Sequence, residues 1–198
     1  MSYSAGERIE LQRQRILKAA KRCFIAHGFH AAAISDIAAE AGISQGLIYR
    51  YFENKRAIIL AIIEMQLVEN RENLDRLQAS TDFVAALGQA YGLWAKGDPE
   101  LWHAGLHGEI AAESLRDPIV ADALRRSEQQ NRQALMAWFH RRDAEMGRRT
   151  SDEDAQLRAA LMSCIVEGLA IRAVREPDLP PEILRAMLER MMPLVLGD

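Results

Sequence analysis

The chain has 198 residues, of which 25 are Lys or Arg, 28 are Asp or Glu, and 49% are hydrophobic. The longest apolar run near the front, residues 57–63, is much shorter than the roughly 20 residues that span a bilayer, so neither a transmembrane helix nor a membrane partner is expected. The first residues have no apolar signal core, which predicts a cytoplasmic protein. Two cysteines, Cys23 and Cys164, are too few to indicate a disulfide framework.

Charge is divided unevenly along the chain. Nine basic and five acidic residues precede residue 57, which gives this end a net charge of +4. Because the whole chain carries -3, the remainder carries -7. A basic end favours a polyanionic partner, since phosphates are bound through Lys and Arg. A solvated helix face would show the same excess, and charge alone does not separate these two explanations.

The hydrophobic period is close to 3.6 residues almost throughout, which predicts an all-α fold of about nine helices. An amphipathic helix is expected over about residues 7–27, followed by two short helices on either side of Gly42 and a long helix from 54 or 55 to about 79. Glycine, proline and capping residues then separate the later helices. These are expected from 83 to about 96, from 99 onward, from 118 to about 146, from about 152 to 176, and over about 182–195.

Residues 34–52 are predicted to form a helix, a turn and a second helix. The turn is expected at Gly42, and Ser44 stands where an N-cap opens the next helix. A helix-turn-helix needs a first helix packed on the scaffold, a tight turn, and a second helix whose N-terminal side chains reach base edges in a major groove. The basic helix before the motif and Lys55 directly after it favour DNA binding over a plain helical corner.

This stretch resembles the tetracycline-repressor-like (TetR) family of bacterial regulators. The resemblance implies an N-terminal domain, 1–54, that binds double-stranded operator DNA, and a domain, 55–198, that dimerises and binds a small-molecule effector. Beyond the first quarter of the chain, the resemblance rests only on the number of predicted helices and on residues 109–118, which are similar to one subgroup of the family. The residues that carry it are Ile16, Ala19, Ala20, Phe24, Gly28, Phe29, Asp36, Ile37, Ala38, Ala41, Gly42, Ile43, Ser44, Gly46, Ile48, Tyr49, Tyr51, Phe52 and Lys55.

The resemblance also implies which residues contact DNA. Gln45 is the best candidate for reading a base, whereas Leu47 can offer only apolar contact to a thymine methyl group. Members usually place Thr or Ser before the first helix of the motif, where this chain has alanines at 31–33, so Ser35 is the candidate replacement. The expected DNA-contacting residues are Ser35, Ser44, Gln45, Gly46, Leu47, Tyr49, Tyr51 and Lys55.

The effector pocket is expected among aromatic and polar side chains of the central helices, because a cavity lined by aromatics suits a small, largely apolar ligand. For each residue taken singly, a place in the hydrophobic core is the more frequent explanation. The candidate residues are Phe83, Tyr91, Trp94, Trp102, His103, Trp138 and Met162.

The last two long helices carry more apolar residues than one monomer core should need. We therefore expect them to pair across a two-fold axis as a four-helix interface in a homodimer. The candidate interface residues are Leu157, Leu161, Cys164, Ile165, Gly168, Met187, Leu188, Met191 and Val195.

These features predict a ligand-responsive, homodimeric transcriptional repressor without a cofactor or a metal. The alternative is a metal-dependent or hydrolytic all-α enzyme. Residues 42–46 match G-x-S-x-G, but a nucleophile elbow needs a strand before the serine, where a helix is predicted. His103 and His107 lack obvious further metal ligands. A third possibility, a helical adaptor, leaves the basic N-terminal helix unexplained.

Overall fold

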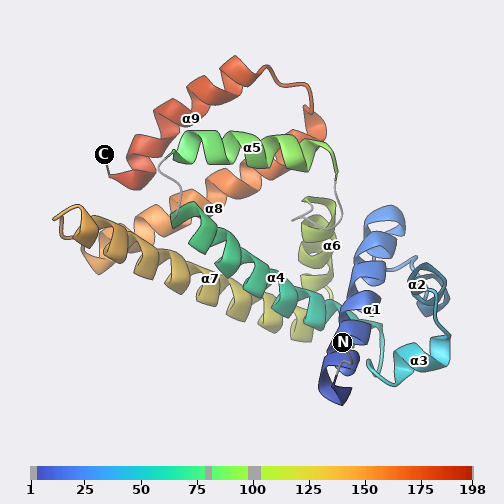
Figure 1. The fold of residues 1–198 in the computed structure, drawn as a ribbon. Helices are drawn as coiled ribbons and strands as arrows, with labels where there is room; N and C mark the ends of the chain where they lie inside the picture. Colours follow the sequence, from blue (N-terminus) through green and yellow to red (C-terminus); the bar gives the residue numbers. More distant parts are fainter. Residues whose placement is uncertain (1–3, 79–81, 98–103, 198) are drawn as a thin grey trace. The chain divides into compact units, whose positions relative to one another are not determined.

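The structure, a computed structural model, describes residues 4–78, 82–97 and 104–197, and within these ranges the chain forms nine α-helices and no strand (Figure 1). The all-α prediction is therefore confirmed. The helices are α1 (Ala5–His27), α2 (Ile34–Ala41), α3 (Gln45–Tyr49), α4 (Lys55–Gln78), α5 (Phe83–Ala95), α6 (Ala104–Ser114), α7 (Pro118–Glu145), α8 (Asp152–Arg175) and α9 (Pro181–Leu196). None of these described helices is long and apolar enough to cross a membrane.

Local capping chemistry sets most helix ends. The Ser4 hydroxyl accepts a hydrogen bond from the Glu7 backbone N–H at the start of α1, and the Ser151 hydroxyl accepts one from Asp154 at the start of α8. At the other end of α1, Gly28 has φ of 78°, a conformation that glycine adopts without the penalty a Cβ would bring. These ends agree with the expected ones to within a few residues.

The helices group into two compact units. The first comprises residues 1–65 and 105–125, and the second comprises residues 66–104 and 126–198. Helix α6 belongs to the first unit, because Leu106 and Ile110 share its core. The expected division into a DNA-binding part, 1–54, and an effector-binding part, 55–198, stays a prediction. Helices α4 and α7 each contribute residues to both units.

The first unit is built around the inward stripe of α1. Phe24 and Ile16 are fully buried there against Ile37 of α2 and Ile48 of α3. Leu106 and Ile110 bring α6 into the same core. The scaffold that holds the helix-turn-helix motif therefore includes a helix that follows it by more than fifty residues.

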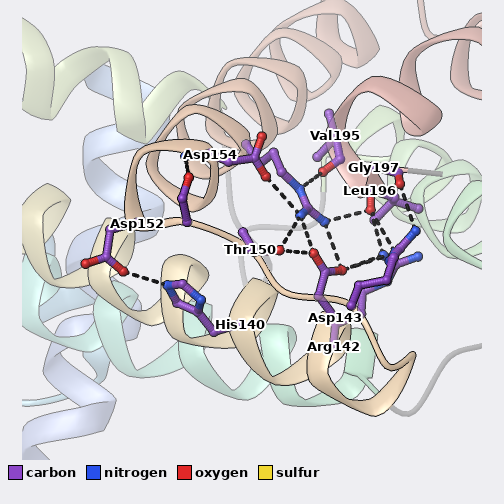
Figure 2. Close-up of polar contacts among 12 residues, drawn as sticks. His140, Arg142, Asp143, Thr150, Asp152, Asp154, Val195, Leu196 and Gly197 are labelled. Carbon is purple, nitrogen blue, oxygen red and sulfur yellow. Dashed lines mark hydrogen bonds and ion pairs between the residues drawn. The ribbon is translucent and has the colours of Figure 1, made fainter.

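The second unit has its own core, in which α5 packs against α8 and α9 (Figure 1). Trp138 and Phe139 of α7 lie at its centre with ring centroids 4.7 Å apart. A polar cluster around Asp143 ties α7 and α8 to the last turn of α9 (Figure 2).

Candidate nucleic-acid interface

The turn between α2 and α3 has the geometry of a helix-turn-helix. Gly42 adopts the left-handed conformation with φ of 62°, and the N–H of Ile43 donates to the carbonyl of Ala38 at 3.0 Å, which closes the end of α2. The Ser44 hydroxyl then accepts a hydrogen bond from the Leu47 N–H at 3.3 Å. Ser44 is thus an N-cap, and a turn and helix α2 precede it where a nucleophile elbow requires a strand.

Helix α3 presents one face to the core and the other to solvent. Ile48 is fully buried, whereas Gln45 and Gly46 are exposed and the Tyr49 side chain is 54% exposed. A tyrosine with this exposure is not a core aromatic. The first turn of α3 is therefore accessible to a partner at the positions from which a recognition helix reads bases.

The neighbouring predicted residues differ in accessibility. Tyr51 and Leu47 are half-buried, and Tyr51 packs against the core of the first unit. Ser44 and Ser35 are exposed. Arg50, which sequence reasoning overlooked, is exposed directly after α3. In the sequence, Arg50 could have been noticed as a cation directly after the second helix of the predicted motif.

Helix α2 lacks a capping side chain at its start, and an acidic residue in its first turn provides a capping hydrogen bond instead. Ala33 occupies the N-cap position and has no side chain that could cap, but its own N–H donates to the Asp36 carboxylate at 2.8 Å. This is the acidic half of a capping box. The helix start therefore does not depend on Ser35, whose phosphate contact stays a prediction.

Lys55 is placed differently from a side chain that reaches out to phosphate. Its ammonium group donates to the carbonyl oxygens of Phe29 at 2.5 Å, His30 at 3.1 Å and Ala32 at 3.0 Å. Burial lowers the pKa of Lys55, and the nearby charge of Glu113 opposes this effect. Three carbonyls match the three N–H donors of the ammonium group. A phosphate contact by Lys55 stays a prediction, and it requires one of these hydrogen bonds to be exchanged.

Carboxylates of α6 contact the same loop. The Glu109 carboxylate accepts a hydrogen bond from the Phe29 N–H at 2.7 Å, and a carboxylate oxygen of Glu113 lies 2.9 Å from Nε2 of His30. Asp117, just before α7, pairs with Arg56 in the first turn of α4. Sequence reasoning missed this row, although its acidic residues recur at every fourth position from 109 to 117.

The expected effector residues that the structure describes lie mostly within the core of the second unit. Trp138 and Met162 are 2% and 4% exposed. Phe83 packs edge-on against Trp138 with ring centroids 5.3 Å apart, and Trp94 is half-buried against the same core. The packing alternative thus fits these side chains, and a role in binding stays a prediction. Trp102 and His103 lie outside the described residues.

Tyr91 lines a groove between α5 and α9. Its hydroxyl donates to the carbonyl of Glu176 at 2.6 Å, and burial raises the pKa of this phenol. The groove has a volume of about 550 Å³ and is bordered by α5, by the connection between α8 and α9, and by the first half of α9. Of the expected effector residues that the structure describes, Tyr91 is the one that lines this groove.

The expected dimer residues divide into two groups. Leu157 is 59% exposed, and Leu161, Cys164 and Gly168 are exposed with it on α8. Ile165, Met187 and Met191 are half-buried. Leu188 and Val195, by contrast, are 0% and 1% exposed and belong to the core of the second unit. They face the inside of the protomer because they fall on the stripe of α9 that packs against α5 and α8.

Comparisons with known proteins agree with this geometry. Residues 16–62 match the family model of bacterial regulatory proteins of the tetR family, and residues 97–197 match that of the C-terminal part of BetI-type transcriptional repressors. The chain is 34% identical over 121 residues to the HTH-type transcriptional regulator UidR of Escherichia coli. That match covers 57% of each chain, so the chain spans little more than half the length of this relative.

Two further proteins are similar over nearly their whole length. The HTH-type transcriptional repressor Rv1474c of Mycobacterium tuberculosis is 25% identical over 191 residues, which is 96% of this chain and 95% of that protein. The structure of GusR from Salmonella enterica superposes with a TM-score of 0.71 at 26% identity and covers 94% of this chain and 96% of GusR.

Proposed function

Because the chain belongs to the tetR family of bacterial regulatory proteins, with a C-terminal part of the BetI type, we propose that it is a transcriptional repressor that a small-molecule effector releases from DNA. It binds a palindromic operator as a homodimer. Membership of a family of regulators leaves the enzyme alternative without support. Its place of action is the cytoplasm, where bacterial chromosomal DNA lies.

The observation that carries the proposal is the capped and exposed first turn of α3. Ser44 holds this turn in a defined conformation, and Gln45 and Tyr49 are accessible on its outer side. A glutamine amide offers a donor and an acceptor to an adenine edge, and a tyrosine hydroxyl can donate to phosphate. Gln45 is therefore proposed to read sequence and Tyr49 to fix the position of the protein on the duplex.

A homodimer is supported by the outer face of α8, where Leu157 and Leu161 are exposed. A dimer places two copies of α3 at related positions, so it recognises two half-sites about one helical turn apart or a multiple of it. A palindromic operator follows from this symmetry.

An effector site next to α4 is supported by Gln66. This side chain is 8% exposed, and its Nε2 atom has no hydrogen-bond partner within the part of the chain that the structure describes. Leaving a buried amide unsatisfied costs about 1–3 kcal/mol, and a polar group of a ligand would recover this cost. Gln66 is therefore proposed to bind the effector.

The same helix supports a route to the DNA-binding motif. Gln66 and Lys55 belong to one continuous α4, roughly 16 Å apart along its axis. A ligand changes DNA affinity only if it binds one of two conformations more tightly. An effector that favours a tilted α4 shifts the loop held by Lys55 and with it the helix-turn-helix motif.

Binding of the protein to DNA from around its own gene tests the DNA-binding proposal. Gel-shift and footprinting experiments should show a protected palindrome. Gln45→Ala should change which base is preferred at one position of each half-site. Arg50→Ala should weaken binding to all sequences, and the slope of the logarithm of the binding constant against the logarithm of salt concentration should become about one unit shallower. Arg132→Ala, which removes an exposed cation of α7, is the matched control and should change neither. A single asymmetric protected half-site would contradict the proposal.

A variant of Gln66 tests the effector site. Gln66→Leu replaces the buried amide with an apolar side chain of similar size, so the folded protein should become more stable and operator binding should persist. Effector-induced release from the operator should weaken, with Val68→Ala on the exposed side of α4 as control. Unchanged induction by the true effector in Gln66→Leu would place the effector site elsewhere.

A further inference from the structure

The outer side of α8 carries an apolar stripe that no described residue covers. Leu157 is 59% exposed and Ile171 is 43% exposed, with Cys164 exposed midway between them. Ala160 and Gly168 are also exposed, and a Cβ built at Gly168 would meet no atom within 4 Å. At about 100° per residue around the helix axis, each of these five side chains points within roughly 40° of their shared average direction, so they form one stripe along the helix. We call them the α8 face.

The α8 face is self-complementary about Cys164. Leu157 and Ile171 each lie seven residues from Cys164, on opposite sides, and Ala160 and Gly168 each lie four residues from it. When two identical helices pair antiparallel about a two-fold axis, residues at equal distance on opposite sides of the axis face each other. An axis at Cys164 thus sets Leu157 against Ile171 of the second copy and Ala160 against its Gly168.

Charges at the ends of the helix follow the same symmetry. Glu153 precedes Cys164 by eleven residues and Arg175 follows it by eleven, and both are exposed. Eleven residues make slightly more than three full turns, about 20° past the third, so both charges lie on the same side of the helix as Cys164. The antiparallel arrangement brings Glu153 of each copy to Arg175 of the other, whereas a parallel arrangement brings like charges together. Such pairs determine orientation and register more than affinity.

We propose that the α8 face is covered by the α8 face of a second copy of this chain, antiparallel, with the two-fold axis passing beside Cys164. The interface is isologous, since each contact occurs twice except the one on the axis. The proposal rests on the homodimer proposed above and specifies its register.

The register makes a prediction about distance. Small residues on both sides of the axis allow close approach, and packed helix axes lie about 8–10 Å apart. With Cα atoms about 2.3 Å from each axis, Cα atoms that face each other at the crossing are about 3.4–5.4 Å apart. Disulfides usually join Cα atoms about 4.4–6.8 Å apart, so the two Cys164 residues are within reach of one another. Two copies of residue 157, seven residues off the axis, are about 21 Å apart along the helices.

Cross-linking of the full-length protein with diamide, followed by a non-reducing gel, tests this register. Wild type and Cys23→Ser should form a covalent dimer that dithiothreitol reverses, and Cys164→Ser should not. In a chain lacking both native cysteines, Leu157→Cys alone and Ile171→Cys alone should fail to cross-link, and the two together should cross-link. Efficient cross-linking of Leu157→Cys alone, or its absence at Cys164, would overturn the register.

Light scattering under reducing conditions separates this inference from the homodimer itself. A dimer in which Cys164 does not cross-link refutes the register and leaves the homodimer in place, whereas a stable monomer at micromolar concentration refutes both.

Reversing the charges at the ends of α8 tests the antiparallel orientation independently of cross-linking. Glu153→Arg and Arg175→Glu should each raise the dimer dissociation constant several-fold at low salt, and the double variant should restore it. If the double variant instead dimerised more weakly than either single variant, the antiparallel arrangement would be contradicted.

Discussion

Replacing Arg158 with Met should strongly destabilise the folded protein. The Arg158 side chain is almost fully buried, and its guanidinium donates to the Asp143 carboxylate at 2.6 Å. It also donates to the carbonyl oxygens of Val195 at 2.7 Å and Leu196 at 2.6 Å, which are in the last turn of α9. Arg158 therefore joins α7, α8 and the end of α9 at one point.

The magnitude follows from what remains after the change. Removing one partner of a buried ion pair usually costs about 3–5 kcal/mol, because the other charge stays buried. Asp143 keeps hydrogen bonds from Thr150 and from Arg148, and Leu196 keeps one from Arg142 (Figure 2). These contacts compensate in part, so we expect a loss of about 3 kcal/mol, near the lower end of that range.

Urea unfolding at fixed protein concentration measures this loss, since assembly adds to apparent stability. With a slope of about 2 kcal/mol per molar urea, the midpoint should fall by about 1.5 M. Arg185→Met is the matched control, because it removes an arginine whose ion pair with Glu189 lies on the exposed surface of α9, and the midpoint should hardly move. Equal midpoints for Arg158→Met and wild type would refute the reasoning.

The same cluster predicts a dependence on pH. Burial by itself would raise the pKa of Asp143, but hydrogen bonds from Arg158 and Thr150 outweigh it and hold this pKa well below its usual range. A lowered pKa in the folded state stabilises the protein above the unfolded value of about 3.9, and this contribution is lost as the pH falls toward the folded value. The stability difference between wild type and Asp143→Asn should therefore be largest near neutral pH and shrink below about pH 4.

Three further changes test other parts of the structure. Ser44→Ala removes the cap of α3, so unfolding should become easier by about 1 kcal/mol and operator binding should weaken for every sequence; an unchanged gel shift would argue against the role of the cap. Gly88→Ala adds a Cβ that meets no atom within 4 Å, so thermal unfolding should show a gain of about 0.5–1 kcal/mol, and a loss would contradict the open groove. Glu109→Ala leaves the Phe29 N–H without its acceptor, so hydrogen exchange at Phe29 should accelerate, and unchanged protection would show that the carboxylate does not hold the loop.

Helix positions could be predicted because their causes are local. Gly28 and Gly42 end helices through their own backbone conformations, and Ser44 and Ser151 open helices through hydrogen bonds to residues three positions later. The helix-turn-helix motif depends on the same short-range features, which is why its residues could be named before the fold was known. The family resemblance used these same positions.

The partners of individual side chains depended on contacts between distant parts of the chain. Lys55 binds carbonyls that lie 23 to 26 residues earlier, and Glu109 binds a backbone N–H 80 residues earlier. Charge and spacing indicated that Lys55 was basic and close to the motif, but they could not indicate that its donors were already used within the protein. The acidic row of α6 was unrecognised for the same reason.

Residue order along the chain was enough to predict a helical fold, the approximate ends of most helices, and the position of the helix-turn-helix motif, since each of these depends on neighbours within a few residues. It also determined that the last two helices are rich in apolar residues. Packing of α9 against α5 and α8 buries Leu188 and Val195 in the core and leaves Leu157 and Cys164 facing outward, and the sequence did not reveal this difference. A hydrophobic pattern predicts that one face of a helix is buried. Whether that face packs against the same chain or against a second copy depends on how the helices pack in three dimensions.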